Sequence, residues 1–141
     1  MENEELNYIL GISKNQAQDN LALDMVIRKG FSSSVISRMK KRFTITDAEI
    51  AKMAGMSART LRHNLASGKR LSLVASDRIF RLISILDYAT QVLENRGSVI
   101  AWMRHPLIGL GGKRAINCIE TEIGANLVRD ILGRIEWGVP S

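Results

Sequence analysis

Between Ser72 and Glu94 the chain repeats its core-forming residues at the spacing of an α-helix. The inward positions follow an i, i+3, i+4, i+7 pattern and are Ile79, Leu82, Ile83, Leu86, Ala89, Thr90 and Leu93. This period predicts one amphipathic helix. No segment alternates apolar and polar residues for long, and the chain has only two prolines. We therefore predict an all-α fold.

Capping residues predict shorter helices before this one. Asp19 is expected to cap a helix that Gly30 ends, because an aspartate accepts hydrogen bonds from the first N–H groups and a glycine readily adopts the conformation that terminates a helix. Ser33 or Ser34 is expected to cap the next helix. The segment before Gly30 and the segment after it are thus predicted to be separate helices.

The same signals predict two helices after the long one. Gly97 is expected to stop the long helix, and Ser98 to cap a short helix that ends before Pro106. Thr121 is expected to cap the last helix, and Gly133 to close it.

Positive charge is concentrated in the middle of the chain. The net charge is +6, yet residues 28–81 hold thirteen Lys or Arg against three Asp or Glu, and residues 1–27 hold one against five. The remaining residues carry equal numbers of both signs. This distribution favours a polyanionic partner for the central segment. The alternative is a solvated helical surface that happens to be basic.

Residues 46–66 have the pattern of a helix-turn-helix. Thr46 and Glu49 have the spacing of a capping box, Gly55 permits a left-handed turn, and Ser57 can cap a second helix that buries Leu61 and Leu65. In this motif the second helix enters the major groove of DNA. The alternative is ordinary packing of two short helices. We expect the following residues to contact DNA: Ser57, Ala58, Arg59, Thr60, Arg62, His63, Lys69 and Arg70.

The composition disfavours catalysis, a metal site and a membrane anchor. Cys118 has no partner for an intramolecular disulfide, which favours the cytoplasm. Apolar runs are far shorter than the ~20 residues that span a bilayer. Two histidines and one cysteine are too few for a usual structural zinc site. Neither His63 nor His105 lies in a nucleophile-elbow context. We expect no enzyme activity, no catalytic residue, no metal and no cofactor.

Several short motifs follow one another along the chain. They comprise Ser57, Arg59–Leu61 and Leu65; Leu71, Ser76–Arg78 and Arg81–Leu82; Ala101–Trp102, Pro106 and Leu110–Gly112; and Thr121–Glu122, Gly124–Ala125, Val128 and Leu132–Val139. In this order they resemble the Xre/MbcA/ParS antitoxin family, whose partner toxins carry a RES domain. The resemblance covers residues 20–141. Residues 113–119 depart from the family's usual Pro-Leu-Asp-Leu-Leu.

An acidic N-terminal segment at 1–19 precedes the resemblance, which itself implies a helix-turn-helix DNA-binding region at 20–71 and a helical toxin-neutralising region at 72–141. The resemblance also implies a homodimer that blocks its toxin and represses its own operon by binding operator DNA. Such a protein would be bacterial and nucleoid-associated when bound to DNA. The RES toxin consumes NAD⁺, so that cofactor belongs to the partner. Residues 20–43 and the Ile79 to Leu93 helix are candidate dimer surfaces.

The C-terminal segment is the candidate toxin-binding element. We expect the chain to leave its helix after Gly133, so that Ile135, Trp137 and Val139 alternate along an extended strip and face one side. The alternative is that this strip folds back onto the core. The expected toxin contacts are Arg134, Ile135, Glu136, Trp137, Gly138 and Val139.

Two other functions fit the sequence. The chain could be a stand-alone helix-turn-helix transcriptional regulator whose C-terminal half serves dimerisation. It could also be an interaction module whose helix-turn-helix does not bind DNA. An adjacent toxin gene would separate the antitoxin from the regulator, and tighter binding to promoter DNA than to random DNA would exclude the interaction module.

Overall fold

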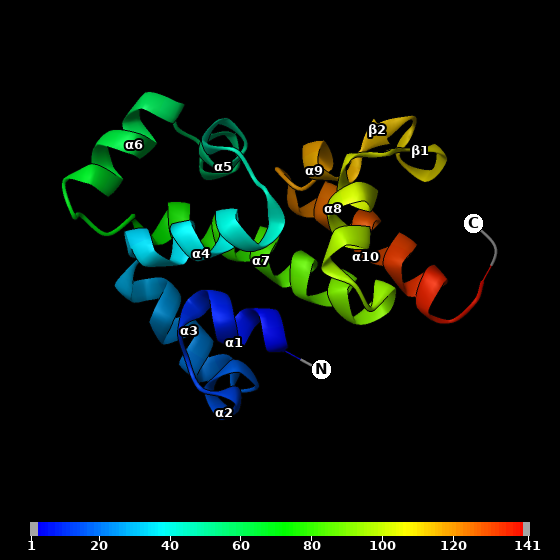
Figure 1. The fold of residues 1–141 in the computed structure, drawn as a ribbon, viewed down its shortest axis with the longest axis horizontal. Helices are drawn as coiled ribbons and strands as arrows, with labels where there is room; N and C mark the ends of the chain where they lie inside the picture. Colours follow the sequence, from blue (N-terminus) through cyan, green and yellow to red (C-terminus); the bar gives the residue numbers. More distant parts are fainter. Residues whose placement is uncertain (1–2, 140–141) are drawn as a thin grey trace.

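A long helix, α7 (Leu73–Leu93), runs through the middle of the molecule, and helices from both ends of the chain pack around it (Figure 1). The computed structural model describes residues 3–139. The Ser72 hydroxyl accepts a hydrogen bond from the Ala75 N–H at 3.1 Å, and Glu94 ends the helix in a left-handed conformation. The predicted inward residues from Ile79 to Ala89 are buried, which confirms the periodicity. They belong to the chain's own core and are not a dimer surface.

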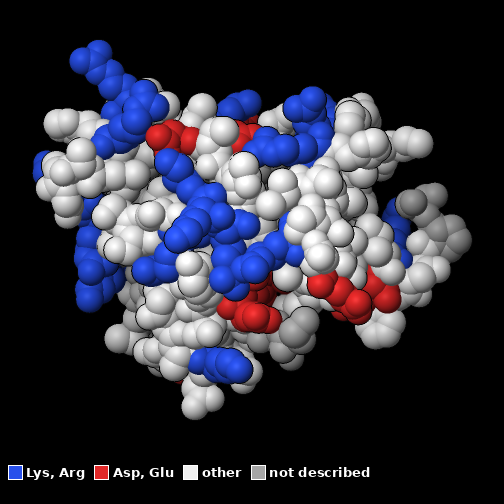
Figure 2. All heavy atoms as spheres, in the orientation of Figure 1, with Lys and Arg blue, Asp and Glu red and all other residues white. Residues whose placement is uncertain are grey.

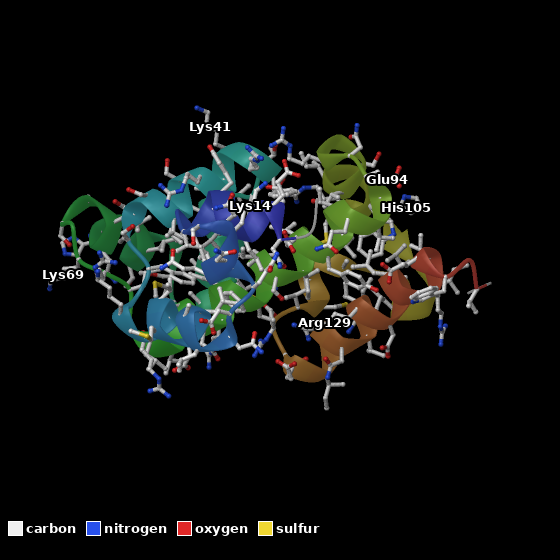
Figure 3. The ribbon with its side chains drawn as sticks, turned by 90° about the horizontal axis from the view of Figure 1, so that it is seen from below. Lys14, Lys41, Lys69, Glu94, His105 and Arg129 are labelled. Atoms are coloured by element: carbon white, nitrogen blue, oxygen red, sulfur yellow. The ribbon has the colours of Figure 1, made fainter. Side chains whose placement is uncertain are left out.

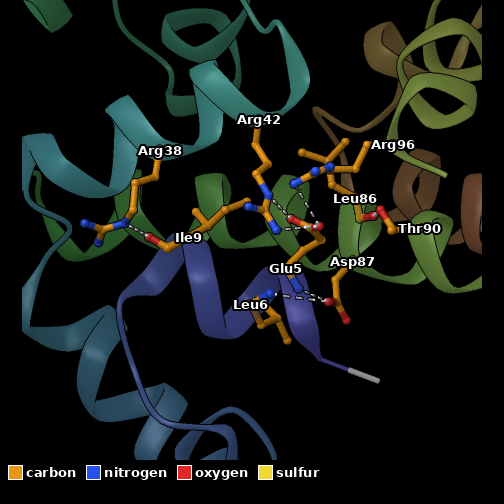
Figure 4. A network of polar contacts seen from close by, with 9 residues as sticks. All are labelled: Glu5, Leu6, Ile9, Arg38, Arg42, Leu86, Asp87, Thr90 and Arg96. Carbon is orange, nitrogen blue, oxygen red and sulfur yellow. Dashed lines mark hydrogen bonds and ion pairs between the residues drawn. The ribbon is translucent and has the colours of Figure 1, made fainter. Parts of the chain in front are cut away.

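The first three helices are α1 (Glu4–Leu10), α2 (Lys14–Ala17) and α3 (Asn20–Lys29). Helix α1 packs on α7 and α4 through a buried polar network (Figure 4). Asp87 accepts hydrogen bonds from the N–H groups of Glu5 and Leu6 at 2.9 and 3.3 Å. The buried Glu5 carboxylate pairs with Arg42 at 3.1 Å and Arg96 at 4.0 Å. One carboxylate of the acidic N-terminal segment, that of Glu5, is thus neutralised within the fold.

Helices α4 (Ser33–Phe43), α5 (Asp47–Ala54) and α6 (Ala58–Ala66) follow. The Asp19 side chain caps α3 and Gly30 ends it, as predicted. The prediction that Ser33 or Ser34 caps α4 is wrong. Both lie inside the helix, and Ser32 occupies the cap position without a side-chain bond to the helix.

The C-terminal part consists of α8 (Arg96–Arg104), β1 (Pro106–Leu107), the 3₁₀ turn η1 (Ile108–Leu110), β2 (Lys113–Arg114), α9 (Ala115–Cys118) and α10 (Glu122–Glu136). The two strands pair antiparallel and are only two residues long, so the all-α prediction is confirmed. Gly111 and Gly112 have φ of 67° and 83°, which lets the chain reverse direction between the strands.

Of the predicted boundaries after α7, those at Gly97 and Ser98 are wrong, and those at Pro106 and Thr121 are confirmed; the boundary at Gly133 is described below with the C-terminal segment. Gly97 does not stop α7, and Ser98 does not cap α8: the Asn95 side chain accepts the hydrogen bond from the Ser98 N–H, so both lie inside α8. Helix α8 ends at Arg104 before Pro106, as predicted. Thr121 caps α10 as predicted, through a bond from the Gly124 N–H at 2.9 Å.

Candidate functional site

The helix-turn-helix forms as the sequence predicts. The Thr46 hydroxyl accepts a hydrogen bond from the Glu49 N–H at 3.1 Å, and the Glu49 carboxylate accepts one from the Thr46 N–H at 3.0 Å. Gly55 has φ of 80° and ends α5. The Ser57 hydroxyl then caps α6 by accepting the Thr60 N–H at 3.0 Å; Leu61 is fully buried as predicted, whereas Leu65 is only half-buried at the edge of the core. These contacts fix the angle between α5 and α6 locally.

Seven of the eight predicted DNA contacts are exposed. They are Ser57, Arg59, Thr60, Arg62, His63, Lys69 and Arg70. The exception is Ala58, which is half-buried and packs against the core. The Arg70 guanidinium donates to the Gly30 carbonyl at 2.9 Å, which ties the segment after α6 to the end of α3. The structure therefore places seven polar side chains on or beside one exposed helix, and their contact with DNA stays a prediction.

Basic side chains gather on the face that contains α4 and α6 (Figure 2). The Asp47 carboxylate pairs with the Lys40 ammonium at 2.5 Å and lies 3.9 Å from the Arg62 guanidinium. Lys40, Asp47 and Arg62 come from α4, α5 and α6 respectively. The predicted contact Arg62 is thus linked through a carboxylate to a basic helix outside the motif. The excess of positive charge in residues 28–81 indicated a basic surface, but it did not identify Lys40 or Asp47 as part of it.

An ion pair joins the helix-turn-helix to the C-terminal part. Arg104, the last residue of α8, donates from both terminal nitrogens to the Glu49 carboxylate, at 2.6 and 2.7 Å, and to the Thr44 carbonyl at 3.0 Å. The hydrogen bond from Arg104, together with those from Thr46, lowers the pKa of Glu49 to about 2. The same pairing raises the pKa of Arg104. Sequence reasoning identified Glu49 only as a capping residue.

The C-terminal segment differs from the predicted extended strip. Helix α10 continues through Gly133 to Glu136, so Gly133 does not close it. The Trp137 N–H then donates to the Gly133 carbonyl at 3.0 Å, and the Val139 N–H to the Arg134 carbonyl at 2.8 Å. With φ of 66° at Gly138, the chain ends its helix in a hydrogen-bonded turn. The expectation of alternating side chains on one face is wrong because the segment is helical or turned.

Trp137 projects from the end of α10. Its side chain is 79% exposed, so it does not complete the chain's own core. Ile135 and Val139 are also exposed. Glu136 accepts a hydrogen bond from the Tyr88 hydroxyl at 3.0 Å, which fixes the end of α10 on α7 and contributes, after burial, to a raised Tyr88 pKa. The two residues that follow Val139 lie outside the described residues.

A groove of about 400 Å³ begins beside this end of α10. Its lining residues come from the hairpin and from α10 and are His105, Pro106, Leu107, Ile108, Gly109, Ile131 and Arg134. Ile108, at the hairpin tip, is 99% exposed. Because Arg134 belongs to both the groove and the predicted toxin contacts, the hairpin and the α10 end form one continuous surface.

Neither a cluster of metal ligands nor a membrane-spanning helix occurs in the described residues 3–139. Within them, no three His, Cys, Asp or Glu side chains cluster closely enough to hold a metal ion. Glu122, which follows the Thr121 cap, pairs instead with Arg81 and Arg129. In the same part of the chain, no helix combines the length and apolar character that crossing a membrane requires.

Comparison with known families divides the chain near the end of α7. Residues 22–84 match the antitoxin Xre-like helix-turn-helix domain, and residues 89–138 match the antitoxin Xre/MbcA/ParS C-terminal toxin-binding domain. The first match contains most of α3, all of α4 to α6 and the predicted DNA contacts. The second contains the hairpin, the groove and Trp137.

Three curated proteins are similar over most of their length. "Antitoxin Xre" of Yersinia enterocolitica is 35% identical, with 80% of this chain and 77% of that protein covered. "Antitoxin Xre" of Photorhabdus laumondii is 25% identical over 84% and 81% of the two chains. The "Prs ADP-ribosylating antitoxin" of a Sphingobium species is 24% identical over 80% and 77%. With the two domain matches, these similarities show that the chain belongs to the Xre family of antitoxins.

Proposed function

We propose that this antitoxin binds and blocks a RES-domain toxin that consumes NAD⁺, and that it represses its own operon through α6. The toxin-binding domain match supports a protein partner. The Sphingobium relative carries ADP-ribosylation in its name. ADP-ribosyl transfer uses NAD⁺, which agrees with the toxin chemistry that the RES resemblance implies. The antitoxin itself contributes binding surfaces and no catalytic group.

The observation that carries the neutralisation proposal is the exposed Trp137 at the end of α10. Large aromatic side chains often dominate the binding free energy of protein interfaces when a partner buries them. Trp137 follows three residues after Arg134, which lines the hairpin groove, at the end of a helix that the Glu136–Tyr88 hydrogen bond holds in place. We propose that Arg134 to Val139, with Trp137 at the centre, block the active-site mouth of the toxin.

Replacing Trp137 tests this proposal. Trp137→Ala should weaken binding to the toxin encoded beside this gene by about 2 kcal/mol or more, roughly 30-fold, and cells expressing that toxin should stop growing. The control is Val74→Ala, an exposed apolar residue in the first turn of α7. Calorimetric titration measures affinity, and thermal melts check that both variants stay folded. A folded Trp137→Ala protein that protects cells as well as the parent contradicts the assignment.

The operon-repression proposal depends on the outward arginines of α6. Arg59→Ala and Arg62→Ala should each weaken binding to the chain's own promoter by roughly 1–3 kcal/mol, because a bidentate guanidinium contact to guanine is lost. Binding isotherms on a promoter duplex and on a random duplex of the same length measure the difference. Equal promoter affinity of the double variant and the parent contradicts the role of α6.

We also propose that the antitoxin is a homodimer. Exposed apolar side chains lie on α3, namely Leu21 and Met25. Helix α3 belongs to the 20–43 region, which leaves that region as the candidate interface. Sedimentation equilibrium should give about twice the chain mass of 15.7 kDa. A mass of one chain at all concentrations would exclude the dimer.

A further inference from the structure

An open groove of about 460 Å³ separates α4 from α6. It is lined by Ser33, Ile36, Ser37, Lys40 and Lys41 of α4 and by Leu65 of α6. The floor is therefore aliphatic, and the α4 side of the rim carries two ammonium groups and two hydroxyl groups. No residue of this rim was among the predicted DNA contacts, all of which lie at or after Ser57.

The two lysines of the rim differ in their surroundings. Lys40 is half-buried and pairs with Asp47 at 2.5 Å. Lys41 is exposed, and Figure 3 shows its side chain pointing away from the body of the molecule. A lysine that projects into solvent is free to move onto an anionic group, whereas Lys40 is held in place at the edge of the groove.

Asp47 links the groove to the proposed recognition helix. It lies between Lys40 and Arg62, whose side chain is 60% exposed. With Lys41 the cluster has three positive groups and one carboxylate, so it stays net positive even with Asp47 ionised. A DNA backbone that follows α6 in a major groove would meet this positive edge beside Arg62.

We propose that the groove between α4 and α6 binds a phosphate of the DNA backbone. Lys40 and Lys41 provide the charge, and the Ser37 hydroxyl donates a hydrogen bond to a phosphate oxygen. Phosphate contacts of this kind set the register of a protein on the duplex without reading sequence. The proposal rests on DNA binding through α6, and it adds α4 as a second contact.

Charge selects DNA over a second copy of this chain as the occupant. Two copies that met symmetrically through this groove would bring their lysine pairs face to face, and like charges in an interface are destabilising. DNA carries a regular array of negative charges, and each lysine that neutralises a phosphate releases condensed counterions.

Charge-removing variants test the groove. The variants are Lys41→Gln, the double variant Lys40→Gln/Lys41→Gln and Ser37→Ala, with Lys41→Arg as a charge-preserving rescue. The matched control is Lys14→Gln, which removes an exposed lysine from α2, on the side of α4 opposite α6 (Figure 1). The probes are a duplex from upstream of the chain's own coding sequence and a random duplex of equal length. Binding is measured over a series of salt concentrations.

Each lysine that is replaced by glutamine should weaken binding roughly five- to tenfold at about 0.1 M salt, by the same factor on the promoter duplex and on the random duplex. Ser37→Ala should weaken binding by a smaller factor, again the same on both duplexes. The slope of log affinity against log salt should fall by about 1 for Lys41→Gln and by about 2 for the double variant. The ratio of promoter to random affinity should stay at the parent value. Lys41→Arg should restore affinity, and Lys14→Gln should behave as the parent.

Three results overturn the proposal. The first is a salt slope for the double variant equal to that of Lys14→Gln. The second is loss of promoter affinity alone, which would make the lysines readers of sequence. The third is a change in sedimentation mass with unchanged DNA binding, which would assign the groove to contact between copies. If the parent binds neither duplex, the DNA-binding function itself fails, and the groove proposal fails with it.

Discussion

At the scale of single residues, the ion pair of Arg104 and Glu49 is expected to contribute to the free energy of unfolding. Arg104→Met retains much of the side-chain volume and removes both hydrogen bonds to the Glu49 carboxylate. We expect a loss of roughly 1–3 kcal/mol in the free energy of unfolding, since the arginine side chain is only 33% exposed. The control is Arg129→Met, whose partner Glu122 is far more exposed, and there we expect less than about 1 kcal/mol.

Acid should weaken the same pair. The Glu49 pKa is lowered from 4.5 to about 2 in the folded chain, so the folded state binds this proton less readily than the unfolded state. The stabilisation is therefore present above pH 4.5 and is lost as the pH falls from 4.5 toward 2. Urea unfolding at several pH values should show a weaker acid dependence in Arg104→Met than in the parent. Parallel profiles of the two proteins would exclude this role for the pair.

The sequence predicts local contacts of single residues well and distant ones poorly. Asp19, Thr46, Ser57 and Thr121 cap their helices as expected, because each bonds an N–H group two or three positions further along. Arg104 and Glu49 are 55 positions apart, and only the folded arrangement of α5 and α8 brings them together. Lys40 and Lys41 of α4 were not predicted as a site for the same reason. The sequence shows only a general excess of positive charge, and the groove that they line forms on folding.

At the scale of elements, the sequence alone did not distinguish the glycines that end helices from those that lie inside them. Gly55 ends α5 as expected, but Gly97 and Gly133 lie inside helices. A glycine permits a helix to end, and the backbone bonds and packing around it decide whether it does. At Gly133, the helix continues because the turns beyond it form hydrogen bonds and Glu136 is fixed by Tyr88. For this reason the C-terminal segment, which was predicted to be extended, forms the end of α10 and a turn.

Two glycines of α10 should respond in opposite directions to alanine. A Cβ at Gly124 would lie 1.9 Å from the Cys118 carbonyl oxygen, so Gly124→Ala must push α10 away from α9. We expect it to lose roughly 3 kcal/mol or more of stability. At Gly133 the nearest atom, the Tyr88 hydroxyl oxygen, is at 3.5 Å, and Gly133→Ala should gain roughly 0.5–1 kcal/mol.

Chemical denaturation of the two variants measures this contrast directly. Both substitutions add one methyl group to the same helix, so each serves as the other's control. Equal stabilities of the two variants would mean that the close approach of α10 to α9 at Gly124 does not constrain the fold.

At the scale of the whole molecule, α7 is shared by the two family domains. The helix-turn-helix match ends at residue 84 and the toxin-binding match begins at 89, both within this helix. Helix α7 contacts α1, α3 and α5 of the N-terminal part and also α8 and α10 of the C-terminal part. The boundary proposed from sequence, at residue 71, would assign the whole of α7 to the C-terminal region. Neither region retains its complete core without this helix.

We therefore expect a single cooperative unfolding transition. A fragment of residues 1–71 should lack cooperative thermal unfolding, because Ile50 and the other core residues of α5 would lose the α7 face on which they pack. Extending the fragment to residue 93 restores α7 and should restore helical structure in circular dichroism. In the full chain, circular dichroism and fluorescence of the half-buried Trp102 should report the same midpoint. Two separate midpoints, or a cooperatively folded 1–71 fragment, would show that the DNA-binding and toxin-binding regions fold independently and would contradict the role of α7 as the helix that both cores share.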